Sequence, residues 1–172
     1  MQELERTYLI KTIPNWLEKL PHKEILDIYI PSSAEHPVLR IRKVGNKYET
    51  TKKEPIRGGD SSDQLETTTA LTQEEYAELA ELKGKRVRKI RYYLTEKNHT
   101  FEIDVFQDGL KGLILVDVEF KTTREKDVFV IPDFCLAEVT QEKFCAGGML
   151  CGKKYEDIKK ELQRFGYLSI VI

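Results

Sequence analysis

The sequence has no long apolar run and no excess of either charge. No stretch of its 172 residues approaches the roughly 18 apolar residues of a membrane-spanning helix, so we expect no membrane partner. The formal net charge is −1, whereas a protein that coats nucleic acid typically carries a basic excess, so we expect no nucleic-acid partner. The N-terminal stretch carries Glu3, Glu5 and Arg6 and lacks an apolar segment, which argues against a signal peptide.

Cysteine is scarce as well. Cys135, Cys145 and Cys151 are odd in number and form no CxxC pair, so their spacing does not predict a thiolate metal site. We expect three reduced, packed cysteines in a cytoplasmic protein. With 33% charged and 40% apolar residues, the chain has the composition of a folded globular protein. Its length fits one domain over residues 1–172.

Most of the chain alternates apolar and polar residues, a pattern typical of β-strands. The expected strands span residues 1–11, 24–30, 38–44, 47–53, 64–69, 86–95, 99–107 and 112–122, with a shorter one at 134–140. The expected helices span residues 13–20, 72–82 and 153–165, the second beginning at a capping box of Thr72 and Glu75. We expect a mobile loop at 57–63 and a C-terminal helix and tail over 150–172.

Eight strands joined mostly as neighbours predict an antiparallel meander that closes on itself. The expected fold is therefore α+β: an eight-stranded, closed antiparallel β-barrel with helices packed outside. Several strands carry two charged side chains at alternate positions, and their other face is apolar. If the helices cover the apolar face from outside, the charged face lines the interior of the barrel, which becomes a polar tunnel.

The charged side chains of these strands form two sets of opposite sign. The cationic set, whose guanidinium and ammonium groups suit phosphate oxygens, comprises Arg40, Arg42, Lys52, Lys89 and Arg91. The acidic set, whose hard oxygen atoms suit Mg²⁺ or Mn²⁺, comprises Glu3, Glu5, Glu102, Asp104, Asp117 and Glu119. A polyphosphate bridged by divalent ions would satisfy both sets. A lattice of cross-strand ion pairs would do so too, and the residues alone leave both open.

The stretch Glu3-Leu4-Glu5-Arg6-Thr7-Tyr8-Leu9 resembles the ExExK strand that opens the CYTH domains, or triphosphate tunnel metalloenzymes. Further segments resemble the family in the same order along about four fifths of the chain. They are residues 39–42, 48–52, 89–94, 101–106, 110–113, 116–120 and 138–140. The resemblance implies an eight-stranded tunnel that binds a small-molecule triphosphate and hydrolyses it with Mg²⁺ or Mn²⁺.

The resemblance also implies roles for single residues, by their positions in the motifs. The implied metal ligands are Glu3, Glu5, Asp117 and Glu119. The implied substrate-binding residues are Arg40, Arg42, Lys52, Lys89 and Arg91, with Glu102 and Asp104 supporting them or a second metal. The implied catalytic residues are Glu3, Glu5 and Tyr29, the last at the position of a tunnel-mouth tyrosine.

One position departs from the motif, because its lysine is replaced by Thr7. A hydroxyl carries no charge, so some stabilisation of the transition state should be missing. Hydrolysis of tripolyphosphate or of an organic triphosphate is our first hypothesis. An adenylyl cyclase of the class IV type, and a catalytically weak module that binds polyphosphate or nucleotide, stay open as alternatives. A homodimer stays open as well.

Overall fold

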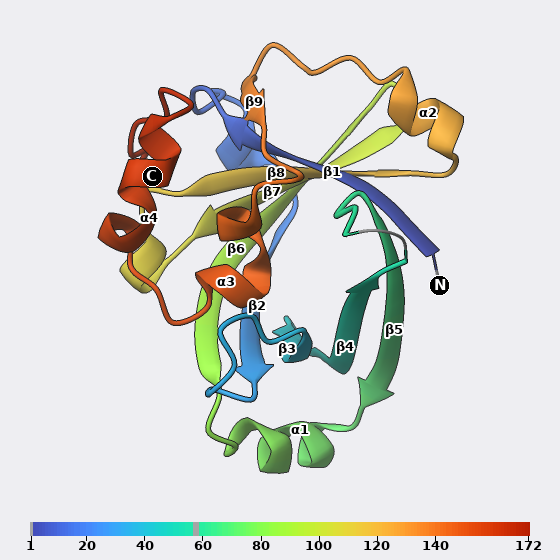
Figure 1. Ribbon diagram of the computed structural model, residues 1–172, viewed down its shortest axis with the longest axis vertical. Coiled ribbons are helices and arrows are strands. Elements are labelled where there is room, and N and C mark those ends of the chain that lie inside the picture. The colour runs from blue at the N-terminus through green and yellow to red at the C-terminus, as the bar shows by residue number, and fades with distance from the viewer. Residues whose placement is uncertain (1, 57–58) are drawn as a thin grey trace.

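The computed structural model describes residues 2–56 and 59–172, which form nine strands in one antiparallel sheet (Figure 1). The strands are β1 (Gln2–Ile10), β2 (His22–Ile30), β3 (Leu39–Val44), β4 (Lys47–Pro55), β5 (Asp63–Leu71), β6 (Lys85–Glu96), β7 (His99–Phe106), β8 (Ile114–Phe120) and β9 (Cys135–Glu138). Each of the nine lies on a segment that the alternating pattern predicts.

The sheet closes into a barrel because β1 pairs with strands on both of its edges. The strand order is β5-β4-β3-β2-β6-β7-β8-β1, and β1 pairs again with β5. Residues 4–9 of β1 pair with β8, and residues 2–4 pair with β5. The remaining part of the second edge, at residues 8–10, pairs with β9. The predicted eight-stranded closed barrel is thus confirmed, and β9 extends it by a ninth strand.

Helices α1 (Gln73–Ala80), α2 (Thr123–Asp127) and α4 (Tyr155–Gln163) lie around the outside of the barrel, and α3 (Gly147–Leu150) lies at the opening of the tunnel (Figure 1). The 3-10 turns are η1 (Leu17–Lys19), η2 (Asp108–Leu110) and η3 (Lys143–Cys145). The capping box of Thr72 and Glu75 begins α1 as predicted. The helix expected at 13–20 is wrong in extent, because only the single 3-10 turn η1 forms there.

The apolar core lies against the outer face of the barrel. Tyr8 and Ile10 on β1 are buried in the same cluster as Val116 on β8 and Leu162 on α4. The tail is fixed to this core by Tyr167, whose hydroxyl accepts a hydrogen bond from the Ile114 amide and donates one to the Gly112 carbonyl. Because the covered face of these strands is apolar, their polar face is directed into the barrel.

The connections show three further features. Of the loop expected at 57–63, residues 57 and 58 lie outside the described residues, while Ser62 is buried and accepts a hydrogen bond from Lys126 Nζ at 2.5 Å. The three cysteines are free and buried, as expected. In the part of the chain that the structure describes, no helix is long and apolar enough to cross a membrane.

Candidate active site in the barrel tunnel

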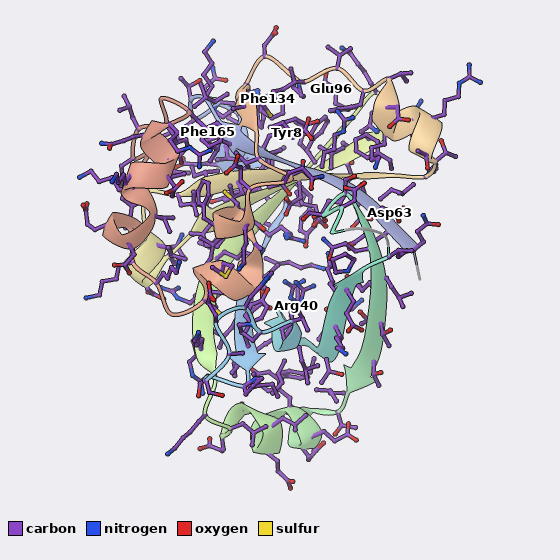
Figure 2. The ribbon with its side chains drawn as sticks, viewed as in Figure 1. Tyr8, Arg40, Asp63, Glu96, Phe134 and Phe165 are labelled. Carbon is purple, nitrogen blue, oxygen red and sulfur yellow. The ribbon has the colours of Figure 1, made fainter. Side chains whose placement is uncertain are left out.

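The barrel encloses a cavity of about 590 Å³, which we call the tunnel. Its wall consists of alternate residues of the strands, as Glu3, Glu5 and Thr7 on β1 illustrate. Figure 2 shows Arg40 in the space ringed by the strands, whereas Tyr8 lies on the other side of β1. Of the residues implied by the family resemblance, all except Lys52 line the tunnel.

Three carboxylates meet at one part of the tunnel wall. Glu3 and Glu5 on β1 and Glu119 on β8 each offer an oxygen atom, and these atoms lie within 4.8 Å of one another. The pairing of β1 with β8 accounts for this, because Glu5 is directly opposite Glu119 in the register. Burial raises the pKa of all three carboxyl groups above the ordinary value of 4.5. We call Glu3, Glu5 and Glu119 the carboxylate triad.

A lysine from β4 balances part of this negative charge. Lys53 Nζ lies 2.5 Å from Glu3 Oε2, 3.7 Å from Glu5 Oε2 and 3.4 Å from Glu66 Oε2. Burial alone would lower the pKa of Lys53, but Glu5 and Glu3 raise it above the ordinary value. Lys53 is therefore a charged ammonium group inside the tunnel.

The prediction that Lys52 faces the tunnel is wrong. Its side chain is 47% exposed on the outer face of β4, and Nζ lies 2.9 Å from Glu54 Oε1. The β4 residues that line the tunnel are Glu49, Lys53 and Pro55, which lie on the opposite face of the strand from Lys52. Adjacent lysines place one ammonium group on each face of a strand, so the pattern could not tell which of the two lines the tunnel. Lys53 was missed for this reason, and its neighbour Glu66 on β5 is brought beside it only by the pairing of β4 with β5.

On the opposite side of the tunnel, Arg42 is held by a carboxylate that the sequence analysis missed. Arg42 Nε and Nη2 donate to the two carboxylate oxygens of Asp27 at 2.6 and 2.7 Å. The two residues are directly opposite each other in the pairing of β2 with β3. Burial alone would raise the pKa of Asp27, but Arg42 lowers it well below the ordinary value. The charge of Arg42 is thus already balanced inside the protein.

The two cations of β6 share one carboxylate on β7. Arg91 Nε and Nη2 each donate to Asp104 at 2.7 Å, and Lys89 Nζ donates to the same group. Glu102 accepts a further bond from Arg91 Nη1. Burial opposes ionisation of Asp104, yet Arg91 and Lys89 lower its pKa to about 2. The alternation of β6 and β7 predicts that these four residues face the tunnel, and the structure brings them together there.

Arg40 differs from the other tunnel cations. Its Nη2 lies 4.0 Å from Glu66 Oε2, beyond hydrogen-bonding distance. Among the described residues, its buried Nε has no hydrogen-bond partner. A buried guanidinium donor without a partner costs free energy unless a ligand accepts its bond. Arg40 is therefore well suited to hold an anion in the tunnel.

Asp117 lies apart from the carboxylate triad. Its Oδ1 accepts a hydrogen bond from Thr7 Oγ1 at 2.8 Å, and its Oδ2 lies 3.6 Å from Arg91 Nη2. Burial and the negative charges of Glu5 and Asp104 raise the pKa of Asp117 to about 7. Of the four implied metal ligands, the structure thus gathers three in the triad and places Asp117 beside Thr7.

Tyr29 contacts the short helix α3 at the edge of the tunnel. A Cβ atom added at Gly147 would lie 2.2 Å from Tyr29 Oη, and one added at Gly148 would lie 2.1 Å from the Pro37 carbonyl oxygen. Glycine at both positions therefore allows α3 to approach β2 and the following loop closely. The double glycine forms this buried contact, which no pattern in the sequence indicates.

Comparisons with known proteins agree with this geometry. No family model matches the chain. An inorganic triphosphatase of Nitrosomonas europaea is 34% identical over 145 residues, which are 83% of this chain and 92% of that protein. The crystal structure of an inorganic triphosphatase superposes with a TM-score of 0.62 at 26% identity, covering 88% of this chain and 95% of the other.

A third comparison extends the likeness in fold only. The structure of a proposed adenylate cyclase of Bacillus halodurans matches with a TM-score of 0.56 at 13% identity, over 99% of this chain and 94% of the other. At this identity the match shows a shared barrel and carries no information on the reaction. The sequence relationship, the closed barrel and the charged tunnel together establish that the chain belongs to the CYTH family, the triphosphate tunnel metalloenzymes.

Proposed function

We propose that this chain hydrolyses inorganic tripolyphosphate or another small triphosphate bound in the tunnel, with Mg²⁺ or Mn²⁺ as cofactor. The observation that carries the proposal is that the carboxylate triad and a set of guanidinium and ammonium groups face one another across a single cavity. The name of the related inorganic triphosphatase supports the same reaction class.

The cationic side chains would bind the phosphate chain. Arg40 has a buried donor without a partner among the described residues, and Lys53 carries a positive charge beside the triad. Lys89 and Arg91 add two further cations on the wall formed by β6. Such groups, fixed before the substrate arrives, stabilise the charge that develops on phosphoryl oxygens in the transition state.

The carboxylate triad fits the proposed divalent cation. Glu3, Glu5 and Glu119 offer three hard oxygen ligands, the type that Mg²⁺ and Mn²⁺ prefer, and these oxygens lie within 4.8 Å of one another. These residues would hold the cation, and Asp117 would support it from the same strand as Glu119. When bound, such a cation neutralises phosphate charge and orients an attacking water.

Tyr29 would act at the edge of the tunnel. Its side chain is only 5% exposed, and its hydroxyl lies against the backbone of α3. A hydroxyl in this place can donate a hydrogen bond to a phosphate oxygen. We therefore propose that Tyr29 orients one end of the phosphate chain.

The test is phosphate release from tripolyphosphate, ATP and thiamine triphosphate, each with Mg²⁺ and with Mn²⁺, with cyclic nucleotide measured in the ATP reactions. We expect phosphate release that requires the divalent cation and is fastest with tripolyphosphate. Cyclic AMP without phosphate release would identify a cyclase instead. Calorimetric binding of tripolyphosphate with no turnover of any substrate would identify a binding module, and the proposal would be wrong.

A further inference from the structure

Both backbone polar groups of Thr7 are hydrogen-bonded to the segment that follows β9, on one edge of β1. The Thr7 amide donates to Thr140 Oγ1 at 3.0 Å. The Thr7 carbonyl accepts a hydrogen bond from the Val139 amide at 2.8 Å. Thr7 is also paired with Asp117 across β1 and β8. A residue held by backbone contacts on both edges of its strand can place its side chain precisely.

The side chain of Thr7 makes one polar contact that bears on the site. Its hydroxyl donates to Asp117 Oδ1 at 2.8 Å. The other oxygen of Asp117 lies 3.6 Å from Arg91 Nη2, outside hydrogen-bonding distance. Thr7 Oγ1 is thus the donor that fixes the rotation of this carboxylate, since hydrogen bonds are strongly directional.

The surroundings of Asp117 explain why the donor is uncharged. Directly opposite Asp117 on the second neighbouring strand is Glu102, and Arg91 already bonds Glu102 and Asp104. A hydroxyl holds Asp117 without adding a positive charge beside it. The contact with Thr7 therefore orients the Asp117 carboxylate without changing the sum of charges in this part of the tunnel.

We propose that Thr7 is a positioning residue: its hydroxyl fixes the Asp117 carboxylate in the orientation that the reaction uses. The replacement of the motif lysine is then a different way to organise the site rather than the loss of one of its parts. The proposal rests on the proposed triphosphatase function and adds a chain-specific role to it. It requires that the hydroxyl, and not the shape of the side chain, is the important feature.

The first test compares Thr7→Val, which has the same shape without the donor, with Thr7→Ser, which keeps the donor. We expect kcat for tripolyphosphate to fall about tenfold in Thr7→Val, because a hydrogen bond to a charged group is lost. KM should change less than about twofold, since Thr7 does not bind the phosphate chain itself. Thr7→Ser should recover most of the lost kcat. Thr95→Val, an exposed threonine of β6, is the matched control and should equal the parent.

A second readout does not depend on turnover. The protein is labelled with carbon-13 at its aspartate carboxyl groups, and the Asp117 carboxyl resonance is assigned as the one that is absent in Asp117→Asn. The carbon-13 chemical shift of this resonance should change in Thr7→Val. It should return toward the parent position in Thr7→Ser. An unmoved resonance, or a Thr7→Ser variant as slow as Thr7→Val, would overturn the positioning role. A parent chain that hydrolyses no triphosphate would instead overturn the proposed function, and the resonance would still decide the role of Thr7.

Discussion

The two sides of the tunnel differ in how their carboxylates are paired with cations. On the side of β2, β3, β6 and β7, Asp27 and Asp104 each bond a cation directly, and their pKa values lie below the ordinary range. On the side of β1 and β8, the three carboxylates of the triad share Lys53, and their pKa values are raised. On the first side, Asp27 and Asp104 are each paired directly with a cation, whereas on the second side three carboxylates share one ammonium group. Inward charge alone therefore does not mark a ligand site, whereas charge that the protein leaves unbalanced does.

The largest expected effect comes from breaking the buried pair of Asp27 and Arg42 on the first side. Asp27→Asn leaves the buried Arg42 guanidinium without a counter-charge, so the free energy of unfolding should fall by about 3–5 kcal/mol. Urea denaturation would measure this. Glu24→Gln, on the same strand, is the matched control, because the exposed pair of Glu24 with Arg88 contributes at most about 1 kcal/mol. Equal effects of the two substitutions would refute the distinction.

The next largest effect is on activity, and it should differ between the neighbouring lysines of β4. Lys53→Met removes the ammonium group beside the triad, and kcat/KM for tripolyphosphate should fall about 30-fold, the equivalent of about 2 kcal/mol. Lys52→Met changes the outer face of the same strand and should stay within about twofold of the parent. Thermal unfolding of both variants would show whether lost folding contributes. A larger loss in Lys52→Met would mean that the register of β4 is wrong.

A smaller effect concerns pH. The pKa of Asp104 falls from 3.8 to about 2 on folding. A lowered pKa stabilises the fold above pH 4, and this contribution is lost as the pH falls from 4 to 2. The loss amounts to about 2 kcal/mol for Asp104. Denaturation curves at pH 5, 3 and 2 should therefore show a steeper decline for the parent than for Asp104→Asn. Parallel declines would contradict the pairing of Asp104 with Arg91.

Much of this site follows from the sequence wherever one face of a strand is apolar. Ile103 and Val105 on β7 specify which face is covered, so Glu102 and Asp104 were correctly predicted to point inward. The prediction is wrong at β4, where Tyr48 is the aromatic residue of the outer face, which packs against Tyr76 of α1, and both faces otherwise carry mostly polar residues. Asp27 was missed because it lies alone among apolar residues of β2, and only the pairing of β2 with β3 shows that it meets Arg42.

Contacts between residues far apart in the sequence are harder to predict. Gly147 contacts Tyr29, and Thr140 fixes the backbone of Thr7. Each contact joins the last third of the chain to its first strands. Local patterns carry no information on such contacts, because they arise from the closure of the barrel and the path of the segment after β9. The departure at Thr7 was visible in the sequence, whereas its partner Asp117 became apparent only from the register of β1 and β8.

We propose that the carboxylates of the triad hold a divalent cation that this chain uses to hydrolyse triphosphate. The most direct measurement is phosphate release from tripolyphosphate by Glu5→Gln, which keeps the size of the side chain and removes its charge. We predict a loss of at least about 100-fold with an unchanged circular dichroism spectrum, and parent-like release by Glu54→Gln on the outer face of β4. Release by Glu5→Gln at the rate of the parent would contradict the claim.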